Sequence, residues 1–406
     1  MMRKYLLLAA TMGMMIISLI GCDQRTSENQ SSNETGTGVL NGAYSAQPPT
    51  LDPYMTRAIA TSDVMRHVFE TLVTFDSKYN VQPMLAESFE QSADGKTITF
   101  YLRKGVLFHN GEEMKAEDVV ASMTKWKDVP GSVAGEQFPD AVFEAVDDYT
   151  VEMKLPQPLS TTLSVLAHSS GTFPAIMPKE VVENASPEGI NEFIGTGPFK
   201  FEEWKQDQYV HLSRFEDYVA REEPADGLAG KREALVSDLY FHFVTDSSTR
   251  VAGIQSGEYD VAHAVPFDTA DQLESQDDII NHVYPGGFLS IVFNKKAGLF
   301  TDVRAREAVL AAVNMEDVLK AGYTDDRYYI LNHNMMMSHQ TEQWNSPHGE
   351  EKYNQLDPEK AKQLLEEVGY SGEQITIITT RDYDDQYNGA VVVQEQLERI
   401  GMNVEL

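Results

Sequence analysis

The sequence predicts a mixed α/β protein with more than one domain. Its 406 residues are enough for two or three domains, and a composition of 42% hydrophobic and 23% charged residues is ordinary for a globular protein. Two neighbouring stretches show both structural periods. Polar and apolar residues alternate over Thr97–Leu102, which predicts a strand with one buried face. Ala116–Lys125 places Val119 and Met123 on one face of a predicted helix.

The charge of the protein restricts its partners. The formal net charge is −31, which argues against binding to nucleic acid and against charge-driven adhesion to anionic lipid. The acidic residues are expected to solvate the surface, and an acidic site for cationic ligands is the less favoured alternative. No nucleic-acid partner is therefore expected.

The first residues have the pattern of an export signal. Arg3-Lys4 is a short basic start, and the apolar run Tyr5–Ile20 is too short and wrongly flanked for a transmembrane helix. The only cysteine, Cys22, ends Leu19-Ile20-Gly21-Cys22, which resembles the bacterial lipobox. That resemblance implies that residues 1–21 are a lipoprotein signal peptide and that Cys22 receives the lipid. An ordinary signal peptide with a stray cysteine is the alternative.

Residues 22–38 are predicted to be a flexible tether. They are rich in Ser, Thr, Asn and Gly and have no apolar period, so they cannot bury enough surface to offset their ordering entropy. The folded part is expected to begin with a strand at Val39–Tyr44. An extended turn, Gln47–Pro53, follows it, and then a helix over Ser62–Leu72 with Ser62 as its N-cap.

Turn residues separate the next elements. Asp94-Gly95 predicts a two-residue hairpin turn between strands at Ala86–Gln91 and Thr97–Leu102. Gly195-Thr196-Gly197-Pro198 lacks a third glycine, and Pro198 prevents a helix from opening there, so a phosphate-binding loop is disfavoured. Further predicted strands are Asp147–Leu155, Tyr209–Ser213, Val236–Val244, Phe288–Asn294, Ile375–Thr379 and Met402–Leu406. Further predicted helices are Asp246–Gly257, a helix capped by Asp357 with Pro358 at its first position and ending at Gly369, and Gly389–Ile400.

Residues 83–119 also resemble a family signature. Matches to the pattern of the family 5 extracytoplasmic solute-binding proteins are Pro83, Leu85–Ser88, Asp94-Gly95, Thr99-Phe100, Leu102-Arg103, Gly105-Val106, Phe108-His109, Gly111 and Ala116–Val119. This family contains oligopeptide, dipeptide and nickel receptors of ABC importers. One departure is Lys115, where the family usually has a Thr able to cap the helix. The segments Gly195–Phe199 and Phe300–Ala308 resemble further family motifs.

The resemblance implies the type II periplasmic-binding-protein fold. Two α/β lobes would enclose a ligand cleft at a hinge, with an extra subdomain in the first lobe. Lobe I would combine residues 39–67 and 196–285, the accessory subdomain would be 68–195, and lobe II would be 286–406. Asn403–Leu406 resembles a segment inside the family's third domain, so lobe II is expected to be incomplete and the sequence to be truncated at its carboxyl end.

The implied function is binding rather than catalysis. The resemblance implies a monomeric receptor without a cofactor, on the outer face of the bacterial cell membrane or in the periplasm, that delivers oligo- or dipeptides to permease subunits. The positions of certain residues relative to the family pattern imply that they contact the ligand: Tyr44, Ser45, Gln47, Pro48, His168, Phe173 and Phe288. Candidate hinges are Gly195–Pro198 and Pro285–Gly287.

Several alternatives stay open from the sequence. The same receptor class could bind a nickel chelate, haem, an opine or an oligosaccharide, and a truncated product could bind nothing. A hydrolase is disfavoured because Ser169 beside His168 has no G-x-S-x-G elbow around it. Asn332–His339, with His348, is interpreted as a structural loop first, then as a pocket wall, and least as a metal site, because its spacing fits no standard metal motif.

Overall fold

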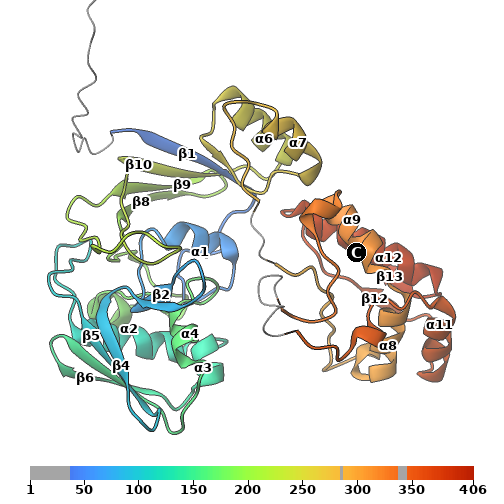
Figure 1. Cartoon of the computed structure of the whole chain (residues 1–406), viewed down its shortest axis with the longest axis horizontal. Coiled ribbons are helices and arrows are strands. Elements are labelled where there is room, and N and C mark those ends of the chain that lie inside the picture. The colour runs from blue at the N-terminus through green and yellow to red at the C-terminus, as the bar shows by residue number, and fades with distance from the viewer. Residues whose placement is uncertain (1–36, 284–286, 337–344) are drawn as a thin grey trace, which may run out of the picture. The chain divides into compact units, whose positions relative to one another are not determined.

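A computed structural model describes residues 37–283, 287–336 and 345–406 (Figure 1). The buried apolar side chains form two separate clusters. The first runs from Leu51 to Phe241 and includes residues of two sheets, and the second runs from Ala308 to Val404. The predicted Cys22 lies outside the described residues. No helix in the described part of the protein is both long enough and apolar enough to cross a membrane.

A five-stranded sheet lies at one side of the first core (Figure 1). Its strand order is β11-β1-β10-β9-β8, in which β1 pairs in parallel with β10 on one side and β11 on the other, while β10, β9 and β8 pair antiparallel. The predicted first strand is confirmed. The bounds are β1 (Val39–Tyr44), β8 (Phe199–Lys205), β9 (Tyr209–Arg214), β10 (Asp238–Phe243) and β11 (Val261–Ala262).

An antiparallel four-stranded sheet follows the order β4-β5-β7-β6. Its strands are β4 (Ala86–Gln91), β5 (Thr97–Leu102), β6 (Val142–Asp147) and β7 (Thr150–Lys154), and a separate hairpin joins β2 (Val73–Phe75) to β3 (Val81–Pro83). The alternation in β5 is confirmed, because Ile98, Phe100 and Leu102 are buried while Tyr101 is exposed. Apolar side chains of one face therefore enter the core.

Two turn predictions need correction. The β4–β5 connection spans residues 92–96 rather than two residues, because the Asp94 carboxylate accepts bonds from the Ser92 hydroxyl and the Lys96 amide and so stabilises a wider loop. The predicted strand from Asp147 begins instead at Thr150. The Asp147 carboxylate accepts a bond from the Tyr149 amide at 2.8 Å, which turns the backbone between β6 and β7.

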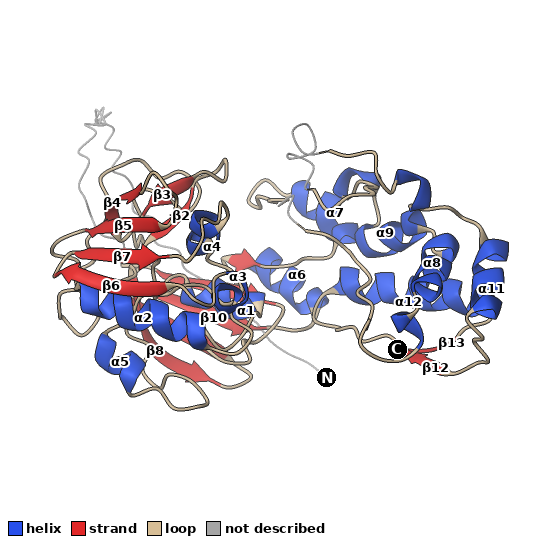
Figure 2. Cartoon of the chain, turned by 90° about the horizontal axis from the view of Figure 1, so that it is seen from below, coloured by secondary structure: helices blue, strands red, loops and turns tan. Residues whose placement is uncertain are grey.

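Helix α2 (Ala116–Asp128) packs on the four-stranded sheet (Figure 2). It buries Val119, Met123 and Trp126, as the helical period predicts. Lys115 replaces the expected capping Thr, but Asp118 accepts a hydrogen bond from the Lys115 amide at 2.8 Å. The carboxylate in the first turn therefore stabilises the start of the helix without an N-cap side-chain acceptor. Shorter helices nearby are α3 (Val133–Gln137), α4 (Thr162–Ala167) and α5 (Lys179–Glu183).

The predicted helix Ser62–Leu72 is shifted. The structure forms α1 at Ile59–Met65, with Ala58 as its N-cap, so Ser62 lies inside the helix. The backbone leaves the helix because the carbonyl groups of His67 and Val68 accept bonds from the amides of Phe199 and Gly197. A Cβ on Gly197 would lie only 2.4 Å from the His67 carbonyl oxygen, so this backbone approach requires glycine.

The second core consists mainly of helices. Helix α8 packs against α11 and α9 against α12, beside a parallel pair of short strands, β12 and β13. The predicted cap of α11 is confirmed, since Asp357 accepts a bond from the Lys360 amide at 3.0 Å. Helix α12 begins five residues before the predicted Gly389. The bounds are α8 (Val303–Ala312), α9 (Met315–Tyr323), α11 (Pro358–Glu367), α12 (Asp384–Arg399), β12 (Gln374–Thr376) and β13 (Asn403–Glu405).

The predicted strand Phe288–Asn294 is wrong for the described structure. The segment is not hydrogen-bonded to any described strand, and Val292 is 89% exposed. The predicted strand Ile375–Thr379 is likewise shortened to β12, and Ile378 is 93% exposed. A segment rich in apolar residues forms a strand only where a partner strand satisfies its backbone groups.

Candidate ligand site

The parallel strands of the five-stranded sheet define one candidate site. The backbone leaves β10, forms α6 (Ser247–Ser256), and returns as β11 on the opposite side of β1. The carboxyl ends of β10, β1 and β11 therefore meet where the strand order reverses. In open α/β sheets, this kind of edge is where ligands commonly bind.

Tyr44 ends β1 at this edge. Its ring stacks on His263, with ring centroids 5.3 Å apart and an interplanar angle of 22°, and it packs on Phe241 at 4.9 Å. Burial, together with the nearby Asp63 carboxylate, raises the pKa of Tyr44 to about 12. Its hydroxyl therefore stays protonated at neutral pH and is able to donate a hydrogen bond.

An ion pair between α1 and its C-cap residue lies within electrostatic reach of this tyrosine. Arg66 Nη2 is 2.6 Å from Asp63 Oδ1, and the side chains are 29% and 20% exposed respectively. The Asp63 carboxylate also opposes the lowering of the His263 pKa, which is caused chiefly by burial. The site thus combines a neutral imidazole, a phenol donor and a paired carboxylate, a set that can bind and orient a polar ligand.

The predicted ligand residues after β1 are only partly accessible. Ser45 is 1% exposed, and Pro48 is buried too. The Gln47 side-chain amide donates a hydrogen bond to Gln206 at 3.2 Å, and its oxygen accepts one from the Asp207 amide at 2.5 Å. Among these residues, Tyr44 has the clearest position beside the strand ends.

The other predicted contacts lie in separate places. His168 is exposed and accepts a bond from the Ser170 amide, while Phe173 is 1% exposed within the first core. The loop that carries both reaches α1 through a 3.5 Å bond from the Ser62 hydroxyl to the Gly171 carbonyl. Phe288 is 44% exposed and lines a different feature of the structure, a large cavity.

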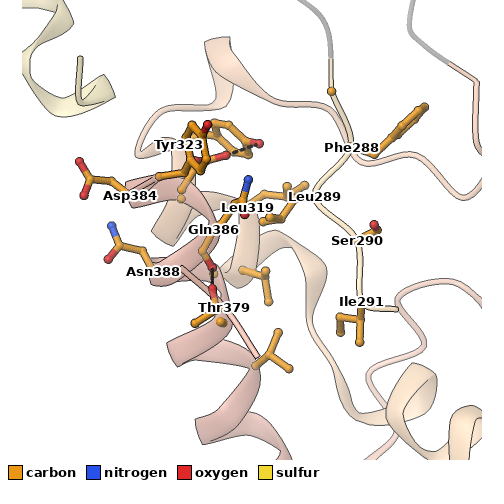
Figure 3. A pocket seen from close by; sticks show the side chains of 18 of the residues that line it. Phe288, Leu289, Ser290, Ile291, Leu319, Tyr323, Thr379, Asp384, Gln386 and Asn388 are labelled. Carbon is orange, nitrogen blue, oxygen red and sulfur yellow. Dashed lines mark hydrogen bonds between the residues drawn. The ribbon is translucent and has the colours of Figure 1, made fainter. Parts of the chain in front are cut away.

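This cavity has a volume of about 1820 Å³. Figure 3 shows part of its lining: an extended segment with Phe288, Leu289, Ser290 and Ile291, and the first turns of α12 with Asp384, Gln386 and Asn388. Its apolar lining includes Val318, Val393 and Leu397, which also belong to the second core. The cavity therefore borders that core, although these three side chains are almost completely buried.

The polar part of the cavity lies at the start of α12. The Tyr323 hydroxyl donates a hydrogen bond to Asp385 Oδ2 at 3.2 Å, and burial with the neighbouring Asp385 charge raises the pKa of Tyr323 to about 12. Asp384 is the residue before Asp385, in the same first turn of α12, and also lines the cavity. A ligand there would meet aromatic surface and carboxylate oxygens together.

The sequence did not indicate several residues of the site. Asp63 and Arg66 were predicted only as helix positions, and His263 follows a strand of just two residues. The i, i+3 spacing of an acid and a base was the one local signal for the ion pair. The position of His263 could not be found locally because it depends on the pairing of β11 with β1.

No metal site is evident in the described ranges 37–283, 287–336 and 345–406, where no group of three or more His, Cys, Asp and Glu residues could hold an ion. Part of the His- and Met-rich segment, residues 337–344, lies outside these ranges. In the described part, His333 Nε2 is hydrogen-bonded to the Ser346 carbonyl at 2.6 Å, and Met335 is 80% exposed.

The fold and site define the class of protein. The strand ends, the separate cores and the mixed α/β sheets agree with strong matches to solved type II periplasmic binding proteins. A family model described as "Bacterial extracellular solute-binding proteins, family 5 Middle" matches residues 80–406. The protein belongs to this family, which confirms the resemblance found in its sequence.

Named relatives fit this family. The protein is 32% identical over 371 residues to the probable peptide ABC transporter periplasmic-binding protein y4tO of Sinorhizobium fredii, with coverage of 87% of this sequence and 67% of the relative. It resembles DppA of Helicobacter pylori in complex with the peptide STSA, with a TM-score of 0.77, 27% identity and coverage of 91% and 73%. For the binding protein AgaA of A. tumefaciens R10 in complex with agropinic acid, the TM-score is 0.79, with 25% identity and coverage of 91% and 72%.

Proposed function

We propose that this protein is a receptor that captures peptides outside the membrane and delivers them to the permease of an ABC importer. The observation that carries the proposal is the convergence of Tyr44, His263 and the Asp63–Arg66 pair at the carboxyl ends of parallel strands, within a family of solute-binding proteins. The peptide-binding names of two similar proteins support peptides as the ligand class.

The finer parts of the proposal follow the sequence. Cys22 would carry the lipid that anchors the mature protein to the outer face of the membrane, with residues 22–38 as its tether. Residues 39–67 with 196–285 would form the lobe I core, 68–195 its subdomain and 286–406 lobe II. The protein would act as a monomer. The predicted residues around Tyr44 and Phe288 would contact the ligand.

An opine is the second candidate ligand. The similarity to AgaA, whose solved complex contains agropinic acid, favours testing this chemistry beside peptides. Agropinic acid and a peptide share a carboxylate group, which a hydrogen-bond donor such as Tyr44 would recognise in the same way. The two candidates therefore differ in the ligand and not in the receptor class.

Thermal unfolding of the full-length protein tests the proposal. A peptide pool at about 100 times its dissociation constant should stabilise the folded state by roughly 2.7 kcal/mol and raise the midpoint visibly. Agropinic acid forms the second arm. A cooperative transition that rises only with agropinic acid would replace peptides by opines, and a transition that ignores both would contradict the proposed function.

Site variants make the test specific. Tyr44→Ala should abolish most of the ligand-induced rise, because it removes the phenol donor and the partner of the His263 ring. Tyr101→Ala is the matched control, since Tyr101 is exposed on a strand of the other sheet. Equal ligand responses in the two variants would mean that the ligand binds away from the strand ends.

A further inference from the structure

Arg250 has an unusual set of partners for a buried charge. It lies in the first half of α6 and is only 1% exposed. Its guanidinium donates to four backbone carbonyl groups: Nη1 to Val244 at 2.7 Å and Thr245 at 3.0 Å, Nε to His263 at 2.9 Å, and Nη2 to Ala264 at 2.7 Å. The planar fork of arginine can reach two backbone segments at once, which a lysine ammonium cannot.

The two segments are the exits of the parallel strands. Val244-Thr245 follows β10, and His263-Ala264 follows β11. Each is also hydrogen-bonded to the central strand, because the Val244 amide donates to the Tyr44 carbonyl and the His263 amide donates to the Ala43 carbonyl, both at 2.8 Å. Arg250 is thus linked to Tyr44 from both sides of β1. On one side Val244 is hydrogen-bonded to Tyr44, and on the other the His263 ring stacks on it.

We call the four hydrogen bonds from Arg250 to the two strand exits the clamp. The geometry of these two segments depends on the clamp. Ala264 has a φ of +51°, in the left-handed region that is unfavourable for a residue with a Cβ. Its carbonyl oxygen is one of the four acceptors of Arg250. The hydrogen bond holds Ala264 in this conformation and, with the bond to His263, sets the position from which the His263 ring stacks on Tyr44.

Burial is compensated by the carbonyl dipoles. Desolvation lowers the pKa of Arg250, with Asp384 and Asp246 acting in the opposite direction. A guanidinium keeps its charge in proteins, so removing it from water costs free energy. The hydrogen bonds to the four carbonyl groups offset that cost. Removal of the donor would leave these acceptors without a partner in a part-buried setting, and the two segments would be free to separate.

We infer that Arg250 is a positioning residue for ligand binding, which fixes the two strand exits beside Tyr44 and so holds the His263–Tyr44 face in its binding geometry. This inference rests on the proposed function. It assigns to Arg250 no contact with the ligand, because four of its five N–H groups donate to the backbone and the residue is only 1% exposed.

The clamp also extends toward the cavity wall. The segment after His263-Ala264 carries Phe267, whose ring lies 5.2 Å from Tyr323, and Asp271, which pairs with Arg327 at 2.8 Å. Phe267 and Tyr323 both line the cavity. Loss of the clamp should therefore loosen residues 261–267 as a unit, and not only the two carbonyl groups nearest the guanidinium.

Arg250→Lys is the main test, with Arg103→Lys as its matched control. Arg103 is also a buried arginine that donates to two carbonyl groups, those of Val219 and Ala220, and neither of these acceptors belongs to the strand exits. Arg250→Lys should weaken peptide affinity at least tenfold, whereas Arg103→Lys should keep it within twofold even if it lowers the unfolding midpoint.

Hydrogen–deuterium exchange of the ligand-free full-length protein supplies a second measurement. Amides at 244–246 and 261–265 should lose protection in Arg250→Lys and retain it in Arg103→Lys. Arg250→Met serves as the stronger variant, and if it fails to fold, the Lys variant still decides. Wild-type affinity and unchanged exchange in Arg250→Lys would overturn the inference. A wild-type protein that binds no peptide would defeat the proposed function, and the exchange data would still test the clamp.

Discussion

The two hydrophobic cores of this protein differ in the size of their sheets and in the exposure of the apolar side chains around them. The first contains sheets of five and four strands and buries large side chains such as Trp126 and Phe100 almost completely. Among the described residues, the second has four helices around a pair of three-residue strands, and Val292 and Ile378 beside it are 89% and 93% exposed. Segments that were predicted as strands from their apolar residues therefore have different outcomes in the two regions.

The difference shows how far strand formation depends on partners. Thr97–Leu102 pairs with β4 on one side and β7 on the other, so the strand has a hydrogen-bonding neighbour along both edges. Phe288–Asn294 is a nearly continuous apolar run and pairs with no described strand. The start of α11 was predicted correctly because the Asp357 cap and Pro358 at the first position are local features of the sequence.

The largest expected effect is a loss of unfolding free energy when a side chain of the first core is removed. Trp126→Ala should destabilise the protein by about 3–5 kcal/mol, because it opens a cavity and removes the indole bond to the Thr172 carbonyl. Val292→Ala, at an exposed position, should change the unfolding free energy by less than about 0.5 kcal/mol. Denaturant unfolding followed by circular dichroism measures both. Similar losses in the two variants would contradict the contrast between the cores.

Acid should weaken the first core in particular. Burial lowers the pKa of His67 and of His109 to about 4, from an unfolded value near 6.5. As pH falls from 6.5 to 4, the unfolded state takes up these protons before the folded state does. The stability contributed by the neutral histidines is therefore complete above pH 6.5 and is lost toward pH 4.

A single variant isolates this effect. His109 Nε2 is hydrogen-bonded to the Gly197 carbonyl at 2.9 Å, and Nδ1 accepts a bond from the Gly195 amide at 3.3 Å, so only the neutral ring can make both bonds. His109→Gln should make the fall in unfolding midpoint between pH 6.5 and 4 shallower than in the wild type. Parallel slopes in thermal scans would show that His109 does not carry the acid sensitivity.

The exposed apolar face of the second region should bind a hydrophobic dye. Val292→Lys and Ile378→Lys together should reduce the fluorescence of an added naphthalene sulfonate dye by about half or more, with the unfolding midpoint within about 2 °C of the wild type. Val39→Lys is the control, since Val39 is 50% exposed at the start of β1. A large fall in the midpoint would mean that Val292 and Ile378 are buried in solution.

A surface ion pair should have the smallest effect. Arg399 lies 2.5 Å from Glu395 on α12, and both side chains are more than half exposed. Arg399→Ala should change stability by less than about 0.5 kcal/mol because water and salt screen exposed pairs. Denaturant unfolding at low and high salt checks this, and a loss above about 1 kcal/mol would show that α12 needs the pair.

The site was harder to predict than the fold for a physical reason. Tyr44 could be placed because it ends a strand with a clear local pattern. His263 approaches it only after β11 pairs with β1, a contact between residues that are far apart in the sequence, such as Gly42 and Val261. The four acceptors of Arg250 are backbone oxygens, so no side-chain pattern could have indicated its role.

The most direct test of the proposed receptor is isothermal titration of the full-length protein with single peptides from the pool that raised its melting temperature. The account predicts saturable heat with one peptide per protein molecule and a negative heat-capacity change, because a ligand at the strand ends buries apolar surface. It also predicts that Tyr44→Ala removes that heat while Tyr101→Ala retains it. Saturable binding that is equal in both variants, or no heat with any peptide at millimolar concentration, would contradict the account.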